Sequence, residues 1–237
     1  MKLVAFVGSM RGKTSSTYNA VESLINKIKS DIREELTYTV FCADELKIEM
    51  CRGCMLCYQE GCCINDDIQR IEKEILDADI VVLGSPVYVH QVTGPMKNFV
   101  DRLNCWCYEL PLLGKLGITV SVSNTNGNYY VDQYLNKVMD IWGANIVSNI
   151  SIKKYPESNQ EESINIAVEK LLEYLQDDNK RYKVSKTQEI IFQTYKEHFK
   201  NMEKSCLRDY WERNALFEFE TVCDWMNKIQ ANSKGDN

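Results

Sequence analysis

The residues with the most distinctive chemistry are the cysteines of segment 51–63, CRGCMLCYQEGCC, which holds five of the ten cysteines in the chain. Cys51, Cys54 and Cys57 are separated by two residues each, and Cys62 and Cys63 follow directly after residue 61. Zinc sites usually combine two such knuckles, or one knuckle with histidines, and neither is found here. Three thiolates at this spacing can surround one face of an iron–sulfur cluster, which a fourth thiolate completes. The spacing favours such a cluster, with cluster-free thiols beside a redox cofactor, zinc or disulfides as the alternatives.

Composition narrows the class of protein further. A net charge of −6 over 237 residues argues against a general binder of nucleic acids or anionic membranes. The apolar start MKLVAFV is broken at once by Gly8 and Ser9, and no apolar run approaches the ~20 residues of a membrane span. We therefore expect a cytoplasmic protein with no membrane or nucleic-acid partner, in a compartment where disulfides are rare.

Strand-like and helix-like patterns alternate through the first 150 residues. Apolar runs predict five strands, and amphipathic spacing predicts helices between them, one of them capped by Asn65 or Asp66. The simplest architecture is an α/β fold, a doubly wound five-stranded parallel sheet, whose ligands bind at the carboxyl ends of the strands. The predicted strands lie at 3–7, 37–41, 80–83, 117–122 and about 145–152.

After about residue 153 the pattern becomes helical. We expect residues 1–178 to form the α/β domain, with the cysteine-rich insert at 51–63, and residues 179–237 to form a helical C-terminal extension. The aromatic side chains of this extension are expected to pack against the main domain or a second subunit.

The loop that follows the first strand, Gly8–Thr17, combines hydroxyls, backbone donors and two cations at the start of a helix. This combination suits a phosphate monoester, because a helix N-terminus attracts negative charge. The loop is neither a Walker loop nor a G-x-G-x-x-G fingerprint, and an ordinary capped turn is the alternative.

Two further strand ends carry candidate ligand contacts. Residues 84–90, with Pro86 and Tyr88, can line a planar ring, and His90 is expected at the pocket edge rather than as a catalytic base. Asp101 and Arg102 are expected to form a local ion pair. The cysteines outside segment 51–63 are interpreted as buried small hydrophobes: Cys42, Cys105, Cys107, Cys206 and Cys223.

Together these motifs resemble a known family. Gly8-Ser9-x-Arg11 with Ser15-Ser16-Thr17, the cysteine run with Asp66-Asp67, Gly84-Ser85-Pro86-Val87-Tyr88 and Lys97-x-Phe99-x-Asp101-Arg102 occur in this order. The set resembles the flavodoxin-like NADPH-dependent FMN reductases over about residues 1–150, and the cysteine run resembles their iron–sulfur flavoprotein branch.

The resemblance implies FMN, with its phosphate held by Ser9, Arg11, Ser15, Ser16 and Thr17 and its ring against Pro86, Val87 and Tyr88. Ser85, Ser123, Asn124, Thr125 and Gly127, at the same strand ends, are expected as further cofactor contacts. The branch places five residues between its third and fourth cluster ligands, which implies a [4Fe–4S] cluster on Cys51, Cys54, Cys57 and Cys63. Members commonly form homodimers or homotetramers.

The leading hypothesis is an FMN-dependent redox protein that transfers electrons between two-electron and one-electron partners. NAD(P)H or a ferredoxin-like electron carrier and a small-molecule acceptor are the expected partners, and no catalytic side chain is required. The alternatives are a cluster-free NAD(P)H-dependent reductase of flavins, quinones or nitro-compounds, and a non-enzymatic thiol or zinc sensor.

Overall fold

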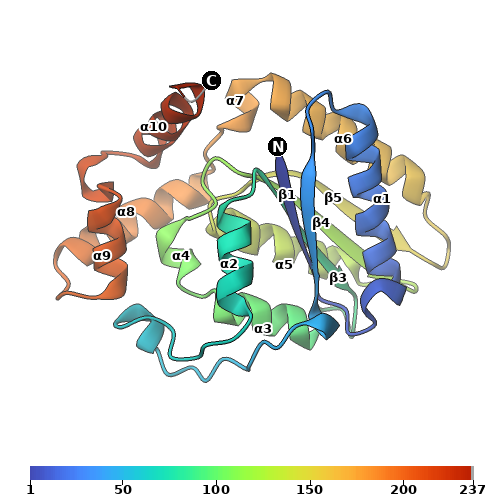
Figure 1. The fold of residues 1–237 in the computed structure, drawn as a ribbon, viewed down its shortest axis with the longest axis horizontal. Coiled ribbons are helices and arrows are strands. Elements are labelled where there is room, and N and C mark those ends of the chain that lie inside the picture. Colours follow the sequence, from blue (N-terminus) through green and yellow to red (C-terminus); the bar gives the residue numbers. More distant parts are fainter. Residues whose placement is uncertain (236–237) are drawn as a thin grey trace.

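A five-stranded parallel sheet lies at the centre of the computed structural model, which describes residues 1–235 (Figure 1). Its strands follow one another across the sheet in the order β2-β1-β3-β4-β5. Nearly all residues of β1, β3 and β4 are buried, as expected where helices cover both faces of a parallel sheet. The predicted flavodoxin-like α/β fold is confirmed. The strands are β1 (Lys2–Val7), β2 (Thr37–Cys42), β3 (Ile80–Pro86), β4 (Leu116–Ser123) and β5 (Asn145–Lys153).

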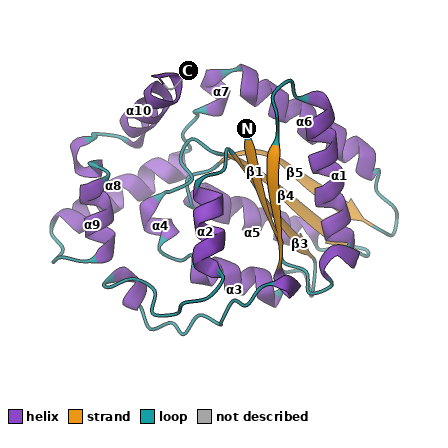
Figure 2. Ribbon diagram, in the orientation of Figure 1, coloured by secondary structure: helices purple, strands orange, loops and turns teal. Residues whose placement is uncertain are grey.

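Helices cover the sheet on both faces (Figure 2). On one face, buried side chains of α1 and α6, such as Leu24 and Leu171, form one apolar core with the sheet. On the other face, α2, α3 and α5 form a second core in which Phe6 stacks on Phe99 with ring centroids 3.9 Å apart. The five helices are α1 (Ser16–Asp31), α2 (Ile68–Leu76), α3 (Gly94–Arg102), α5 (Asn128–Ile141) and α6 (Gln160–Gln176).

The cysteine-rich segment lies between β2 and α2 and is irregular apart from a 3₁₀ turn at Leu56–Tyr58. Its end does not cap α2 as expected, because Asp67 occupies the N-cap position and makes no side-chain capping bond. Asp66 instead accepts a hydrogen bond from the backbone N–H of Ile68, 3.0 Å away, and forms an ion pair with Arg102.

The C-terminal helices pack beside the short helix α4 (Trp106–Glu109) rather than against the sheet (Figure 1). Trp211 is fully buried there, and its indole N–H donates to the carbonyl oxygen of Tyr108 at 3.0 Å. The expected packing of the aromatic side chains against the main domain is thus observed, while residues 236–237 of the predicted extension lie outside the described residues. These helices are α8 (Lys186–Lys200), α9 (Cys206–Arg213) and α10 (Val222–Gly235), whereas the short helix α7 (Asp178–Arg181) packs against α6.

Within residues 1–235, none of the helices combines the length and the apolar character required to cross a membrane.

Candidate functional site

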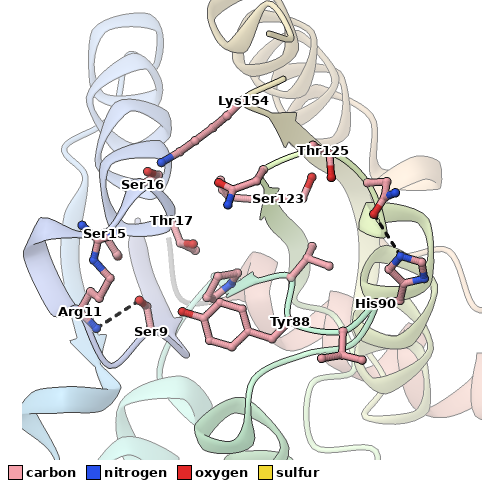
Figure 3. A pocket seen from close by; sticks show the side chains of 16 residues that line it. Ser9, Arg11, Ser15, Ser16, Thr17, Tyr88, His90, Ser123, Thr125 and Lys154 are labelled. Carbon is pink, nitrogen blue, oxygen red and sulfur yellow. Dashed lines mark hydrogen bonds between the residues drawn. The ribbon is translucent and has the colours of Figure 1, made fainter. Parts of the chain in front are cut away.

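A cavity of about 340 Å³ opens at the carboxyl ends of β1, β3 and β4 (Figure 3). Most of the predicted cofactor-binding residues line it, and Arg11 and Lys154 are the charged residues among those described in its wall. A positively charged cavity with many hydroxyls matches the chemistry of a phosphate ester. The predicted residues that line the cavity are Ser9, Arg11, Ser15, Ser16, Thr17, Pro86, Val87, Tyr88, Ser123, Asn124 and Thr125.

The loop that follows β1 (residues 8–17), here called the hydroxyl loop, is held in shape by its own hydrogen bonds. Ser15 is the N-cap of α1 and accepts from the backbone N–H of Tyr18 at 3.1 Å, and Ser9 accepts from the backbone N–H of Arg11 at 3.3 Å. Gly8 is the first residue of this loop, and a Cβ atom at Gly8 would lie 2.6 Å from the Cβ atom of Met96. Glycine is therefore needed for the loop to lie against α3.

The opposite wall contains a strained turn. Tyr88 and Gln91 exchange two backbone hydrogen bonds of 3.0 Å, and the residues between them, Val89 and His90, have φ values of 50° and 59°. A β-branched residue with positive φ is unusual and is often found at functional sites. His90 lies at the cavity edge as expected, and its Nε2 atom is 3.0 Å from Oδ1 of Asn126. This contact links the loops that follow β3 and β4.

Two predicted residues lie outside the cavity wall. Ser85 is buried, and its hydroxyl donates to the carbonyl oxygen of Pro86 and accepts from the backbone N–H of Thr93. Gly127 is the N-cap of α5, with φ of 90°. Both shape the loops that carry the lining residues.

Lys154, which the sequence-based reasoning did not select, extends into the cavity from the end of β5 (Figure 3). Its position directly after the fifth strand was the available signal, because that strand end meets the others at the same edge of the sheet.

All five cysteines of the insert line a second, smaller cavity of about 70 Å³, together with residues from the end of α3. We call it the thiol cavity. The sulfur atoms of Cys54 and Cys63 are 3.9 Å apart. Within residues 1–235, no three His, Cys, Asp or Glu side chains converge as ligands of a single metal ion.

The thiols of this cavity have different electrostatic environments. The backbone N–H of Leu56 lowers the pKa of Cys54, whereas its contact with Cys54 raises the pKa of Cys63. Burial raises the pKa of Cys57, and the thiol of Cys105 donates to the carbonyl oxygen of Cys57 at 3.2 Å. Cys54 is therefore the more readily ionised member of the Cys54–Cys63 pair.

The prediction of an ion pair between Asp101 and Arg102 is wrong. Asp101 pairs with Lys97 one turn earlier on the exposed face of α3, while the Arg102 side chain points into the protein and pairs with Asp66 at 2.5 Å. Although burial opposes it, the hydrogen bond from Arg102 lowers the pKa of Asp66.

The expectation for the remaining cysteines is only partly met. Cys42 is buried, but Cys105, Cys107 and Cys206 are half-buried and Cys223 is exposed.

Helix α3 connects the two cavities. At its first turn, the hydroxyl of Thr93 caps the helix and donates to the carbonyl oxygen of Gly8, in the loop that leads into the larger cavity. At its last turn, Arg102 lines the thiol cavity. Nine helical residues span about 13 Å, so these two contacts lie about one length of α3 apart.

Comparison with known proteins identifies the family. The sequence model of the NADPH-dependent FMN reductase family matches residues 1–156. The chain belongs to this family. The sequence-based recognition of the family is thereby confirmed.

Curated relatives include iron–sulfur flavoproteins. The chain is 30% identical to one from Archaeoglobus fulgidus over 145 residues, which are 60% of this chain and 64% of that protein. It is 32% identical to one from Clostridioides difficile over 158 residues, 65% of this chain and 68% of the relative. The match thus spans slightly less than two thirds of the Archaeoglobus protein.

Among solved structures, the chain is similar to RosB with a bound intermediate, 8-demethyl-8-formylriboflavin-5'-phosphate. The TM-score is 0.62 at 13% identity, with 86% of this chain and 89% of the other covered. At this identity the similarity shows the shared fold.

Proposed function

We propose that the protein is a flavin-dependent oxidoreductase that binds FMN in the larger cavity. Ser9, Arg11, Ser15, Ser16 and Thr17 would hold the phosphate, because their hydroxyls, backbone donors and positive charge gather at the N-terminus of α1. Pro86, Val87 and Tyr88 would lie against the ring. Ser123, Asn124 and Thr125 would contact its polar edge, while Ser85 and Gly127 would shape the two loops.

The thiol cavity would hold a [4Fe–4S] cluster on Cys51, Cys54, Cys57 and Cys63. Soft thiolate donors suit iron–sulfur clusters, and the five cysteines of the insert already face one small cavity. A cluster binds each thiolate through a different iron atom, so its ligands need not converge on a single point as those of one metal ion do. The donor set, whose sulfur atoms line one cavity, fits this cofactor.

The observation that carries the proposal is the attachment of both cavities to opposite ends of α3. FMN can accept two electrons together and release them singly, and an iron–sulfur cluster carries one electron at a time. The chain would hold the two groups at a fixed separation and supply no catalytic acid or base.

The proposed electron donor is NAD(P)H or a ferredoxin-like carrier, and the acceptor is a small molecule. We further propose a cytoplasmic homodimer or homotetramer with no membrane or nucleic-acid partner, and residues 1–178 and 179–237 as α/β domain and helical extension. The family assignment supports the nicotinamide donor.

A second candidate is a cluster-free NAD(P)H-dependent reductase of flavins, quinones or nitro-compounds. It is supported by the family assignment, because the family model that matches residues 1–156 describes NADPH-dependent FMN reductases.

Purification without oxygen, followed by FMN, iron, sulfide and zinc analysis, tests these functions. We expect FMN together with iron and sulfide in the wild-type protein. Cys54→Ala should lose the iron and sulfide but keep FMN, because Cys54 lines only the thiol cavity. The matched control Cys223→Ala, in α10, should keep all three.

Each other outcome supports a different function. FMN without iron, together with steady NAD(P)H oxidation, would support the cluster-free reductase. Zinc without flavin would support a thiol or zinc sensor. Unchanged iron and sulfide in Cys54→Ala would contradict the proposed ligand set.

A further inference from the structure

The guanidinium group of Arg102 is fixed by contacts with both ends of the cysteine-rich segment. Its Nη1 atom donates to the carbonyl oxygen of Glu49 at 2.8 Å, and Nη2 donates to that of Ile64 at 3.4 Å. Asp66 accepts from both nitrogen atoms, and its side chain is 2% exposed. Planar, two-pronged pairing of this kind fixes the orientation of an arginine side chain.

Asn98 holds the same segment one turn earlier on α3. Its amide nitrogen donates to the carbonyl oxygens of Ile48 and Glu49, each at 3.2 Å, and its amide oxygen accepts from the backbone N–H of Cys51 at 3.0 Å. The positions of the first and last cysteines are therefore set by α3 and not by the loop alone.

Cys62 and Cys63 are neighbours in the sequence, but their sulfur atoms have different partners. The Nη2 atom of Arg102 donates to the sulfur of Cys62 at 3.6 Å, a length typical of a hydrogen bond to sulfur. The sulfur of Cys63 instead lies 3.9 Å from that of Cys54. Since the guanidinium cannot follow Cys62 into the cavity, a move of Cys62 would break its contact with a buried positive charge.

We propose that Arg102 is a positioning residue that holds the sulfur of Cys62 at the cavity wall and thereby leaves Cys63 as the fourth cluster ligand. This role rests on the proposed function, because it concerns the ligands of the cluster. A further observation agrees with a role toward a bound group: Nε of Arg102 is buried and has no hydrogen-bond partner among residues 1–235. Native proteins seldom leave such a donor unpaired.

The test replaces Cys62 and Cys63 with serine, one at a time, in proteins with and without the guanidinium of Arg102. In the otherwise wild-type protein, Cys62→Ser should keep its iron and sulfide, whereas Cys63→Ser should lose most of both. In an Arg102→Gln background Cys62 is free to move. Cys63→Ser should therefore keep a several-fold larger share of the iron held by Arg102→Gln alone than it keeps of the wild-type iron when Arg102 is present. Partners of metal ligands typically change metal affinity by about 10–100-fold when mutated.

The recovered cluster should also differ in its spectrum. A ligand taken from Cys62 alters the geometry at one iron atom, so the electron paramagnetic resonance of the reduced protein should shift from that of the wild type. Lys97→Gln provides the matched control, since it removes a cation from the exposed face of the same helix. It should neither rescue Cys63→Ser nor change the spectrum.

Arg102→Gln leaves Asp66 buried without its partner, so the double substitution Arg102→Gln with Asp66→Asn is used if the single variant does not fold. An FMN content equal to that of the wild type shows that the fold is kept. Equal loss of iron in Cys63→Ser with and without Arg102, or loss of iron in Cys62→Ser, would overturn the role of Arg102 alone. Wild-type protein without iron would overturn the cluster itself and this role with it.

Discussion

The two cavities are built in different ways. The larger one is formed by loops that directly follow buried parallel strands, and short-range bonds such as that of Ser15 to Tyr18 hold its hydroxyl loop. The thiol cavity lies in an irregular segment whose ends are fixed by Asn98 and Arg102, 36 to 53 positions further along the chain. The backbone N–H of Cys206, at the start of α9, also donates to the carbonyl oxygen of Gln59 at 3.0 Å.

This difference separates two kinds of preorganisation. Strand ends are placed by the sheet, so the larger cavity depends on the core and tolerates change in single polar side chains. The cysteine-rich segment contributes little to the core and depends on a few buried polar contacts from other elements. Losing one of those contacts should affect the thiol cavity more than the larger cavity.

The largest effect is expected from Asp66→Ala, which removes one partner of the buried Asp66–Arg102 ion pair. An unpaired buried charge typically lowers the free energy of unfolding by about 3–5 kcal/mol. Urea denaturation should show a lower midpoint, and the folded variant should keep FMN while losing iron.

Asp31→Ala is the control for this prediction, because Asp31 pairs with Lys27 on the surface of α1, away from the thiol cavity. Exposed pairs contribute about 0–1 kcal/mol, so this variant should remain close to the wild type. Equal decreases in the free energy of unfolding and in iron content in the two variants would show that the thiol cavity does not depend on the buried pair.

A smaller effect on the free energy of unfolding is expected from the titration of Glu109, which lies where α4 meets the C-terminal helices. Burial and the nearby charge of Glu72 raise the pKa of Glu109 to about 7, against a smaller opposing effect of Arg213. Tyr210 of α9 faces the same carboxyl, and burial raises the pKa of Tyr210 as well.

The raised pKa makes stability depend on pH. The ordinary pKa of the carboxyl is 4.5, so between about pH 4.5 and 7 the native state keeps a proton that the unfolded state releases. The free energy of unfolding therefore falls as pH rises through this window, by roughly 3 kcal/mol in total at about 1.4 kcal/mol per pKa unit. Urea denaturation of Glu109→Gln at several pH values should lack this decline, whereas the exposed control Glu197→Gln should retain it. The same decline in Glu109→Gln would assign it to other groups.

The contrast between the cavities also explains what could be predicted from the sequence. The strands and most residues of the larger cavity were predictable, because apolar runs identify strands and the residues after them share one edge of the sheet. Lys154 was missed although it follows a strand in the same way. The pairing of Arg102 with Asp66 could not be predicted, since 36 positions separate them and the nearer Asp101 offered a local partner. Long-range side-chain contacts leave no periodic signal.

The smallest effect on the free energy of unfolding is expected in the wall of the larger cavity, at the strained turn between Tyr88 and Gln91. Val89 is 99% exposed and has φ of 50°, so its substitution removes little packing but can relieve an unfavourable backbone conformation. Left-handed conformation costs an ordinary residue about 1–2 kcal/mol, and asparagine tolerates it best after glycine. Val89→Asn should therefore raise the free energy of unfolding by about 1 kcal/mol, measured by urea denaturation.

Val89→Ala is the matched control for the turn, because it removes the branched side chain without adding a preference for positive φ. It should stabilise the protein less than Val89→Asn. Since the strain is confined to one turn, neither variant should change the iron content, which depends on the contacts of α3 with the cysteine-rich segment. A fall in iron in Val89→Asn would show instead that the two cavities are coupled through α3, whose first turn is bonded to the flavin side through Thr93 and Gly8.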